Sequence, residues 1–374
     1  MFNKSFFIFC LIVASVVVAF FLFNVRDRIR EVDRYALEQY TVESAELRHA
    51  VCNDGSPAVY YHRPGDEGFE DKWVIWFEGG GGCGSEEGCA ERAKTQTNLT
   101  TSEGTPRRIT QGGILSIDPS VNPDFSQWNH VVLNYCSSDS WTGRVRTTVD
   151  GKQWFFEGKA IVESTIEDLK DEALFGEHHL GTATEVLVTG TSAGGGGAAQ
   201  NLNDIASSLP NATVSGVIDS SWTVSVESEN IDAVVHDEQL QAINDFRRNQ
   251  LDQECVMQEA RALDCQSVSS VYPYILPRTF IYIDQYDRVK LEEIFSIGTW
   301  TKQERQEFMS VYSHAVVDSL AGLEGVFSPQ ETFHGALTNS HFQDVLIDGY
   351  SYADVLGNWY FGKDGPITVI APIE

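Results

Sequence analysis

The sequence is poor in basic residues. It has 26 Lys and Arg against 54 Asp and Glu, so the 374-residue chain carries a formal net charge of −28. Proteins that bind nucleic acids or anionic membrane surfaces rely on Lys and Arg to contact phosphates. We therefore expect neither partner. Four arginines could line a local basic groove but are better interpreted as members of surface ion pairs: Arg107, Arg108, Arg144 and Arg146.

The sequence also lacks the spacing of a metal site. It has no C-x-x-C pair, which argues against bound zinc. No internal repeat is visible. With 42% hydrophobic and 21% charged residues, the composition is that of a globular protein. We expect no metal and no organic cofactor.

One apolar run, residues 6–23, contains no charged residue. It is barely long enough to span a bilayer, and it lacks the small-residue cleavage site of a signal peptide. This favours an uncleaved transmembrane signal anchor over residues 1–24, with a cleaved signal peptide as the alternative. Residues 25–48 show helix-like spacing suited to a stalk. The folded domain is then expected over residues 49–374, and only the N-terminal segment should contact the membrane.

Cysteine usage indicates the compartment. Outside the apolar run the chain has six cysteines, namely Cys52, Cys83, Cys89, Cys136, Cys255 and Cys265. An even number predicts three disulfides in an oxidising environment, and six buried free thiols are the alternative. The basic residues after the apolar run would instead keep the domain cytoplasmic, but the cysteines carry more weight. We expect a membrane-anchored extracytoplasmic domain or a secreted one, and the sequons at Asn98 and Asn211 agree with this.

From residue 52 onward, short apolar segments alternate with helix-like segments. Continuous apolar strands of this kind are buried on both faces, as in a parallel sheet flanked by helices. The predicted strands are 73–77, 131–135, 185–189, 214–218 and 279–283, and the predicted helices are 157–174, 195–208 and 302–321. Residues 222–277 interrupt the alternation. We predict an α/β fold with a helical insertion there that could act as a lid.

The sequence Gly190-Thr-Ser192-Ala-Gly194 matches the G-x-S-x-G motif and lies between a predicted strand and a predicted helix. That context is typical of a nucleophile elbow, in which a tight turn exposes the serine hydroxyl next to a helix N-terminus. A glycine-rich phosphate-binding turn is the alternative. The context favours Ser192 as a catalytic nucleophile.

A serine nucleophile needs a base, and the base needs an acid to orient it. In α/β-hydrolases the order along the chain is Ser, then Asp or Glu, then His. Asp287 follows the strand 279–283, and Asp284 and Asp219 are its rivals. His341 lies downstream and His334 competes with it, whereas His314 lies in the middle of a predicted helix.

A second group of oxyanion donors should follow an early strand. Glu78-Gly79-Gly80-Gly81-Gly82-Cys83 comes directly after 73–77 and fits that role. Glycines free the backbone N–H groups to face a reacting carbonyl, and each such donor stabilises a transition state by roughly 3 kcal/mol. A flexible turn is the alternative, which a disulfide at the end of the loop would oppose.

These motifs resemble the pectin acetylesterase and Notum family of carboxylesterases, which have an α/β-hydrolase-type fold. The resemblance runs from Cys52 to Gly362. The segments that carry it are Cys52-Asn-Asp-Gly-Ser-Pro57, Phe77-Glu-Gly-Gly-Gly-Gly-Cys83, Tyr135-Cys-Ser-Ser-Asp-Ser-Trp141-Thr-Gly143, Gly190-Thr-Ser-Ala-Gly-Gly195, Asp219-Ser-Ser-Trp222, Tyr286-Asp287 and Asn358-Trp-Tyr-Phe361. The segment 135–143 is more similar to the Notum version than to the plant version.

The resemblance implies specific residue roles. Ser192, Asp287 and His341 would form the catalytic triad, and Gly80, Gly81 and Ala193 would donate to the oxyanion. It also implies a Cys83–Cys89 disulfide, which we extend to Cys52–Cys136 and Cys255–Cys265. The chain departs from the family twice: glycines replace an aromatic residue of the glycine loop, and the family's cysteine before the catalytic histidine is missing from Leu337-Thr-Asn-Ser340.

Together these features predict a serine carboxylesterase. Its substrate would be an O-acyl ester, O-acetyl in the first instance, of a glycan or a protein. The alternative is a catalytically inactive module that holds a lipid or a glycan in the same pocket. The presence of all three triad residue types favours the enzyme.

Overall fold

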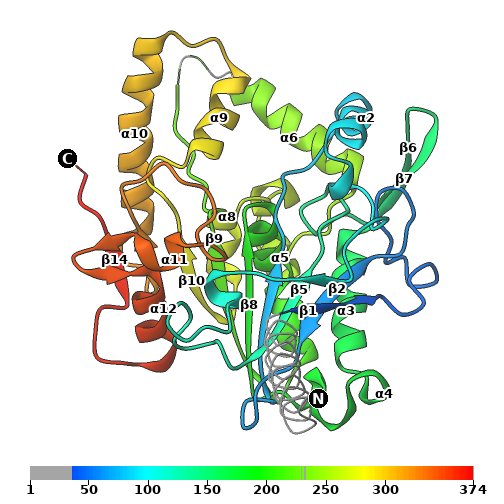
Figure 1. Cartoon of the computed structure of the whole chain (residues 1–374). Coiled ribbons are helices and arrows are strands. Elements are labelled where there is room, and N and C mark those ends of the chain that lie inside the picture. Colours follow the sequence, from blue (N-terminus) through cyan, green and yellow to red (C-terminus); the bar gives the residue numbers. More distant parts are fainter. Residues whose placement is uncertain (1–35, 229, 231–232, 374) are drawn as a thin grey trace, which may run out of the picture.

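The protein is organised around one large sheet. A computed structural model describes residues 36–228, 230 and 233–373 (Figure 1). Its ten-stranded sheet has the order β14-β11-β10-β9-β8-β3-β5-β2-β1-β4. Neighbouring strands are parallel from β14 to β5, and β2, β1 and β4 extend one edge in antiparallel fashion. This confirms the predicted mostly parallel sheet.

The elements are short and regular. The strands are β1 (Leu37–Thr41), β2 (Val59–Arg63), β3 (Lys72–Phe77), β4 (Arg108–Ile109), β5 (Asn129–Leu133), β6 (Val145–Val149), β7 (Lys152–Phe156), β8 (Glu185–Thr191), β9 (Thr213–Asp219), β10 (Arg278–Tyr282), β11 (Val326–Ser328), β12 (Leu346–Ile347), β13 (Tyr350–Ser351) and β14 (Thr368–Ile370). The α-helices are α2 (Glu86–Thr95), α3 (Gly158–Leu169), α4 (Glu172–Phe175), α5 (Ala193–Ser208), α6 (Ala233–Arg247), α7 (Gln253–Val256), α8 (Val268–Val271), α9 (Arg288–Ile297), α10 (Lys302–Leu320), α11 (His341–Asp344) and α12 (Tyr352–Phe361).

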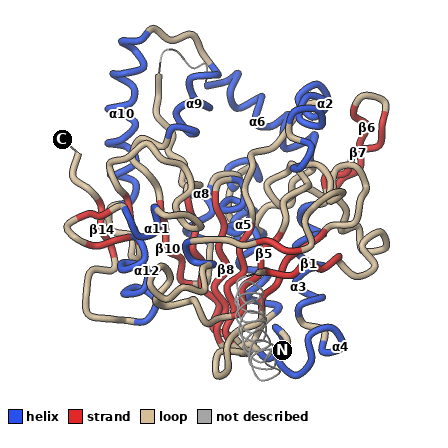
Figure 2. Tube along the Cα trace, viewed as in Figure 1, coloured by secondary structure: helices blue, strands red, loops and turns tan. Residues whose placement is uncertain are grey.

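Both faces of the sheet are buried. Along β3, Trp73 and Ile75 belong to the core on one face, whereas Val74 and Trp76 belong to the core on the other. Because side chains alternate along a strand, a strand covered on both faces has to be apolar throughout. Helices α3, α5 and α10 contribute to the first core, and α11 and α12 contribute to the second (Figure 2).

The predicted insertion is present and largely helical. Between β9 and β10 the chain forms α6, α7 and α8 together with short 3-10 turns. In Figure 1, α6 crosses above the sheet from the side of α9 and α10 toward α2. This position matters for the site, because the carboxyl ends of β8, β9 and β10 lie beneath it.

The stalk prediction is wrong over its described part. Leu37–Thr41 is strand β1, paired with β2 and β4, and Leu37 is completely buried. Backbone pairing of residues 37–41 with β2 therefore makes this segment a strand, although the spacing of its apolar residues is typical of a helix. The folded domain begins by residue 36 rather than at residue 49. The proposed signal anchor, residues 1–24, lies outside the described residues, and no helix in the described part is long and apolar enough to cross a bilayer.

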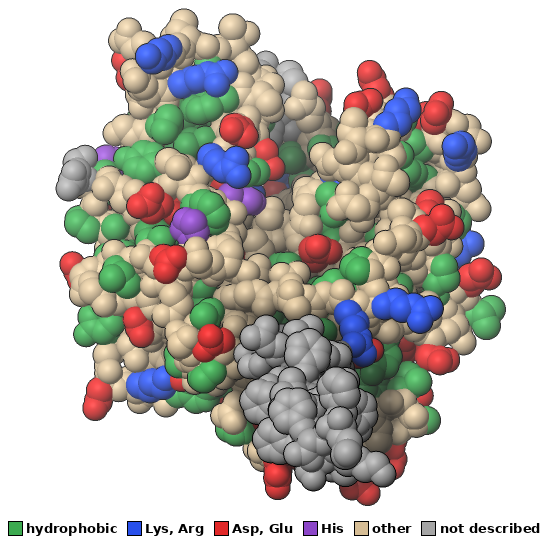
Figure 3. Space-filling model, in the orientation of Figure 1, with side chains coloured by type: hydrophobic (Ala, Val, Ile, Leu, Met, Phe, Trp, Pro, Cys, Tyr) green, Lys and Arg blue, Asp and Glu red, His purple; other side chains and the backbone are tan. Residues whose placement is uncertain are grey.

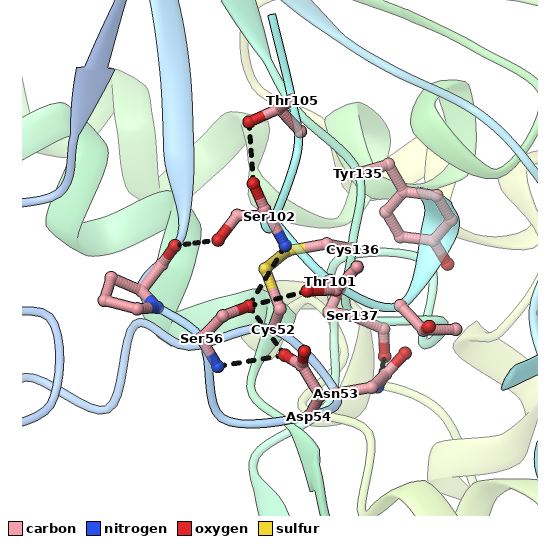
Figure 4. Close-up of a disulfide and its surroundings, with 12 residues drawn as sticks. Cys52, Asn53, Asp54, Ser56, Thr101, Ser102, Thr105, Tyr135, Cys136 and Ser137 are labelled. Carbon is pink, nitrogen blue, oxygen red and sulfur yellow. Dashed lines mark hydrogen bonds between the residues drawn. A yellow bond between two sulfur atoms is a disulfide. The ribbon is translucent and has the colours of Figure 1, made fainter. Parts of the chain in front are cut away.

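Six cysteines form three disulfides. The pairs are Cys83–Cys89, which the resemblance implies, and Cys52–Cys136 and Cys255–Cys265, by which we extended it. Figure 4 shows the first pair, which ties the start of the domain to the loop after β5. Beside it, Asn53 donates to the carbonyl of Ser137 at 2.7 Å. This bond fixes the loop that follows β5.

Loss of the Cys52–Cys136 and Cys255–Cys265 disulfides should differ in cost. Cys52–Cys136 closes a sequence separation of 84, against 10 for Cys255–Cys265, and all four cysteines are completely buried. Loop-closure entropy predicts losses of about 4 to 5 and about 3 kcal/mol respectively in the free energy of unfolding. Denaturant titration of the two double Cys→Ala variants measures this. Equal losses, or a larger loss for the shorter loop, would contradict the loop-closure explanation.

Candidate active site

Ser192 sits on a strained turn between β8 and α5. Its backbone has φ 59° and ψ −127°, a region that non-glycine residues rarely occupy. A β-carbon on Gly190 would lie 2.2 Å from the carbonyl oxygen of Gly194, and one on Gly194 would lie 2.0 Å from that of Phe77. Only glycine fits at both positions. The turn leaves Ser192 partly exposed at the N-terminus of a 16-residue helix.

Asp287 and His334 form a hydrogen-bonded pair. His334 Nδ1 lies 2.9 and 2.7 Å from the two carboxylate oxygens of Asp287, which is completely buried. The same carboxylate caps α9 by accepting hydrogen bonds from the amides of Val289 and Lys290. The other ring nitrogen of His334, Nε2, is buried and has no hydrogen-bond partner among the described residues.

His341 is not brought to Asp287, so its selection over His334 is corrected. His341 begins α11, its Nδ1 lies 3.2 Å from Asn339 Oδ1, and its ring stacks on Phe333 at 3.6 Å between centroids. The order of residues along the chain permits either histidine. Only the path of the loop after β11 distinguishes them, and that loop presents His334.

Asp284, one of the two acidic alternatives to Asp287, is hydrogen-bonded to a tyrosine rather than to a histidine. Asp284 accepts a hydrogen bond from the Tyr282 hydroxyl at 2.9 Å. Burial, with a smaller contribution from Asp219 and Asp287, raises its pKa to about 8. A carboxyl group that is largely protonated at neutral pH cannot stabilise an imidazolium as Asp287 can.

Asp219, the weakest of the three acidic candidates, links the two halves of the site. Its Oδ2 accepts from Thr191 Oγ1 at 2.9 Å and from the amides of Ala336 and Leu337 at 3.0 and 2.9 Å. Its carbonyl oxygen accepts from the Ser192 amide at 2.9 Å. The residue before the nucleophile and the loop after His334 are thus fastened to one carboxylate.

The neighbouring serine adds to this link. Ser220 Oγ accepts a hydrogen bond from the Gly335 amide at 2.8 Å. A β-carbon on Gly335 would lie 2.7 Å from Thr191 Cγ2, so the histidine loop is packed directly against the elbow. This contact brings the loop that follows His334 against the residue that precedes Ser192.

The glycine loop after β3 lies against the nucleophile. A β-carbon on Gly79 would be 2.3 Å from the Thr191 carbonyl oxygen and 3.1 Å from Ser192 Cβ. The loop's carbonyls point away and are held: Tyr135 Oη donates to Gly81, and Arg92 Nη2 donates to Gly80, both at 2.8 Å. Among the described residues nothing accepts a hydrogen bond from the amides of Gly80, Gly81 or Ala193. These amides are therefore available to a ligand.

A cavity of about 480 Å³ opens above Ser192. Gly81, Ala193 and Ser192 contribute to its lining, together with side chains of α6 and α9. Of its 22 lining residues, six have aliphatic side chains, namely Ala193, Leu240, Ile243, Leu251, Val268 and Ile297. The others are glycine, polar or charged, but their carbon atoms also line the cavity, so most of its surface is apolar.

The four arginines considered for a basic groove do not form one at the cavity. Three of them pair with carboxylates: Arg108 with the exposed Glu38, Arg144 with the exposed Glu163 and Arg146 with the buried Glu157. Figure 3 shows Lys and Arg scattered among acidic residues on the visible face, which is hollowed in its upper half. The arginine that does line the cavity is Arg247, at the end of α6. Its helix lies in the insertion, where no motif singled it out.

Both sequons lie on the surface. Asn98 is exposed in a 3-10 turn after α2, and Asn211 is exposed between α5 and β9. Glycosylation at both remains a prediction. Among the described residues, no group of three or more His, Cys, Asp or Glu is arranged to hold a metal ion.

Known proteins are similar to this chain in sequence and in overall fold. Palmitoleoyl-protein carboxylesterase NOTUM of Drosophila melanogaster is 30% identical over 83% of this chain, which spans 46% of that protein, about half its length. Pectin acetylesterase 4 of Arabidopsis thaliana is 29% identical, covering 92% of this chain and 88% of that one. The crystal structure of the Wnt deacylase Notum from Drosophila superimposes with a TM-score of 0.80 at 27% identity, covering 90% of this chain and 97% of that chain.

This structural match confirms the α/β-hydrolase-like fold. The pectinacetylesterase family model matches residues 31–371. The chain therefore belongs to the pectinacetylesterase family.

Proposed function

We propose that the protein is a serine carboxylesterase that hydrolyses O-acyl esters, with Ser192 as nucleophile, His334 as base and Asp287 as the acid that orients it. The observation that carries the proposal is the Asp287–His334 pair, packed through Asp219 and Gly335 against a strained serine at a cavity. Two of the residues are those of the sequence-based triad. The third is the histidine that was its alternative.

The geometry suggests the following reaction. His334 Nε2 takes the proton of Ser192 Oγ as the oxygen attacks the ester carbonyl, and Asp287 stabilises the imidazolium through Nδ1. The amides of Gly80, Gly81 and Ala193 receive the negative charge of the tetrahedral intermediate. His334 then protonates the leaving alcohol, and later activates the water that releases the acid. The chemistry requires only these residues.

The acyl group is proposed to be short, O-acetyl in the first instance. The relatives are named for two different esters, palmitoleoyl-protein and acetylated pectin. Pectin acetylesterase 4 aligns over 92% of this chain and 88% of its own length, whereas this chain spans only 46% of the Drosophila NOTUM protein. This match over both full lengths supports an acetyl ester of a glycan or a protein.

We also propose that the domain works outside the cytoplasm. Three disulfides persist only in an oxidising compartment. Whether a signal anchor tethers the domain or a signal peptide releases it depends on residues outside the described part. Both arrangements place the same domain on the same side of the membrane.

Removal of the nucleophile should abolish turnover. Ser192→Ala is expected to lower kcat for p-nitrophenyl acetate by about 10,000-fold or more, as in other serine hydrolases. The wild type should react covalently with a fluorophosphonate probe, and the variant should not. A folded wild-type protein that hydrolyses no ester and takes up no probe would instead favour the inactive binding module.

The two histidines give a matched comparison. His334→Ala should reduce kcat about as strongly as Ser192→Ala, because the base is lost. His341→Ala should reduce it by less than about 3-fold, since His341 contacts only Asn339 and Phe333. Steady-state kinetics on both variants, with thermal unfolding to show that each is folded, decide between them. A larger effect at His341 would refute the assignment.

Chain-length selectivity tests the acyl group. If the acyl group is short, p-nitrophenyl acetate should have a kcat/KM at least about 10-fold above that of p-nitrophenyl octanoate, because a site shaped for acetyl cannot hold the longer chain in the reactive geometry. A preference for octanoate would replace the acetyl proposal with a long-chain one and would leave the triad proposal intact.

A further inference from the structure

Arg247 is held in the cavity by the glycine loop. It is the last residue of α6, its Nε donates to the carbonyl of Cys83 at 2.8 Å, and its side chain lines the same cavity as Ser192. A β-carbon on Gly82 would lie 2.8 Å from Arg247 Nη2. Glycine at position 82 therefore leaves room for the guanidinium where another residue would place a side chain.

The approach of α6 to this loop uses a second glycine. A β-carbon on Gly84 would lie 2.4 Å from Ile243 Cγ1, one turn before Arg247. Two positions of the loop are thus shaped to receive the helix. The absence of aromatic residues from the loop has a direct consequence: a positive charge occupies that wall of the cavity.

Arg247 has no ion-pair partner among the described residues. Asp139, whose charge interacts with that of Arg247, is completely buried and already accepts hydrogen bonds from Ser137 Oγ and from the amides of Trp141 and Gly158. Burial raises the pKa of Asp139 to about 6, while the hydrogen bonds from Ser137 and Gly158 and a smaller contribution from Arg247 lower it.

Several arginines at the surface pair with carboxylates, as Arg261 does with Asp237 at 2.6 Å. The buried Arg92 has neutral partners instead and donates to Ser138 Oγ, Gln96 and the Gly80 carbonyl. Arg247 differs from both, because only its Nε has a hydrogen-bond acceptor among the described residues, so its Nη groups can bind a ligand.

The cavity has the opposite charge to the rest of the molecule. Its charged lining residues are Arg247, Lys290 and Glu293, and Lys290 Nζ lies 3.8 Å from Glu293. That pair largely cancels and leaves the charge of Arg247, in a chain whose net charge is −28. An arginine retains its charge at all physiological pH values and its planar group matches a carboxylate through two parallel hydrogen bonds.

We propose that Arg247 binds a carboxylate of the substrate in the same cavity as the reacting ester, so that the enzyme prefers O-acyl esters carrying a negative charge. The inference rests on the proposed esterase function and adds a substrate class to it. A purely structural Arg247 would fasten α6 to Cys83 and would support charged and neutral esters equally.

The wild-type protein provides the first test. Acetate release is measured from a series of ω-acetoxy acids, from acetoxyacetate to 6-acetoxyhexanoate, and from the primary amide of each. The series is used because it samples the spacing between ester and carboxylate. At one spacing or more, kcat/KM should be at least about 10-fold higher for the acid than for its amide, and the preference should fall as salt is raised.

Variants of Arg247 then show whether this residue causes the preference for the acid over the amide. Arg247→Gln should reduce the ratio of acid to amide toward one, mainly by raising KM for the acid, and Arg247→Lys should keep part of it. Arg248→Gln removes the same charge at the neighbouring, exposed position and should leave the ratio unchanged. Fluorophosphonate labelling of Ser192 shows whether each variant retains an assembled site.

The outcomes separate the two proposals. Equal rates for acid and amide at every spacing in the wild type would overturn the role of Arg247 alone. Equal loss of both activities in Arg247→Gln would show a structural role and would also overturn it. Failure of all esters and of the probe in the wild type would overturn the esterase function itself, and the inference with it.

Discussion

Close packing of three backbone segments determines this site. The start of α5, the end of β3 and the turn at Ser192 meet where Gly190 and Gly194 have no side chains, and a β-carbon on Gly194 would lie only 2.0 Å from the Phe77 carbonyl oxygen. That contact brings the glycine loop to the nucleophile. The same constraint therefore exposes the serine hydroxyl and places free amides beside it, and neither feature could form if the segments were further apart.

Asp219 holds the loop that carries His334 against the strand that precedes Ser192. Burial raises the pKa of its carboxyl group, whereas hydrogen bonds from Leu337, Thr191 and Ser220 lower it. A buried carboxylate needs such partners, and here they come from the strand before Ser192 and from the loop that carries His334. Catalytic groups must keep their relative positions within a fraction of an ångström. We infer that Asp219 maintains the spacing between nucleophile and base without taking part in the proton transfer.

Local sequence patterns predicted the features that depend on local structure. The central strands, helix α5 and the elbow follow from apolar runs and glycine spacing, and the three disulfides agree with the pairing taken from the family resemblance. The patterns failed where tertiary contacts decide. Residues 37–41 are an edge strand because β2 is available to pair with them. His334 and His341 are equivalent by chain order, and only the bonds from Asp219 and Ser220 to the intervening loop show which one faces Asp287. The place of Arg247 in the cavity could not be predicted from local sequence, because it depends on contact with Gly82, 165 positions earlier in the sequence.

The most direct test of the account is a crystal structure of the fluorophosphonate-treated protein. The account predicts a phosphorus–oxygen bond to Ser192, a phosphoryl oxygen within hydrogen-bond distance of the amides of Gly80, Gly81 and Ala193, and His334 Nε2 facing the bonded serine oxygen. A probe attached to another residue, or a phosphoryl oxygen directed away from the glycine loop, would contradict it.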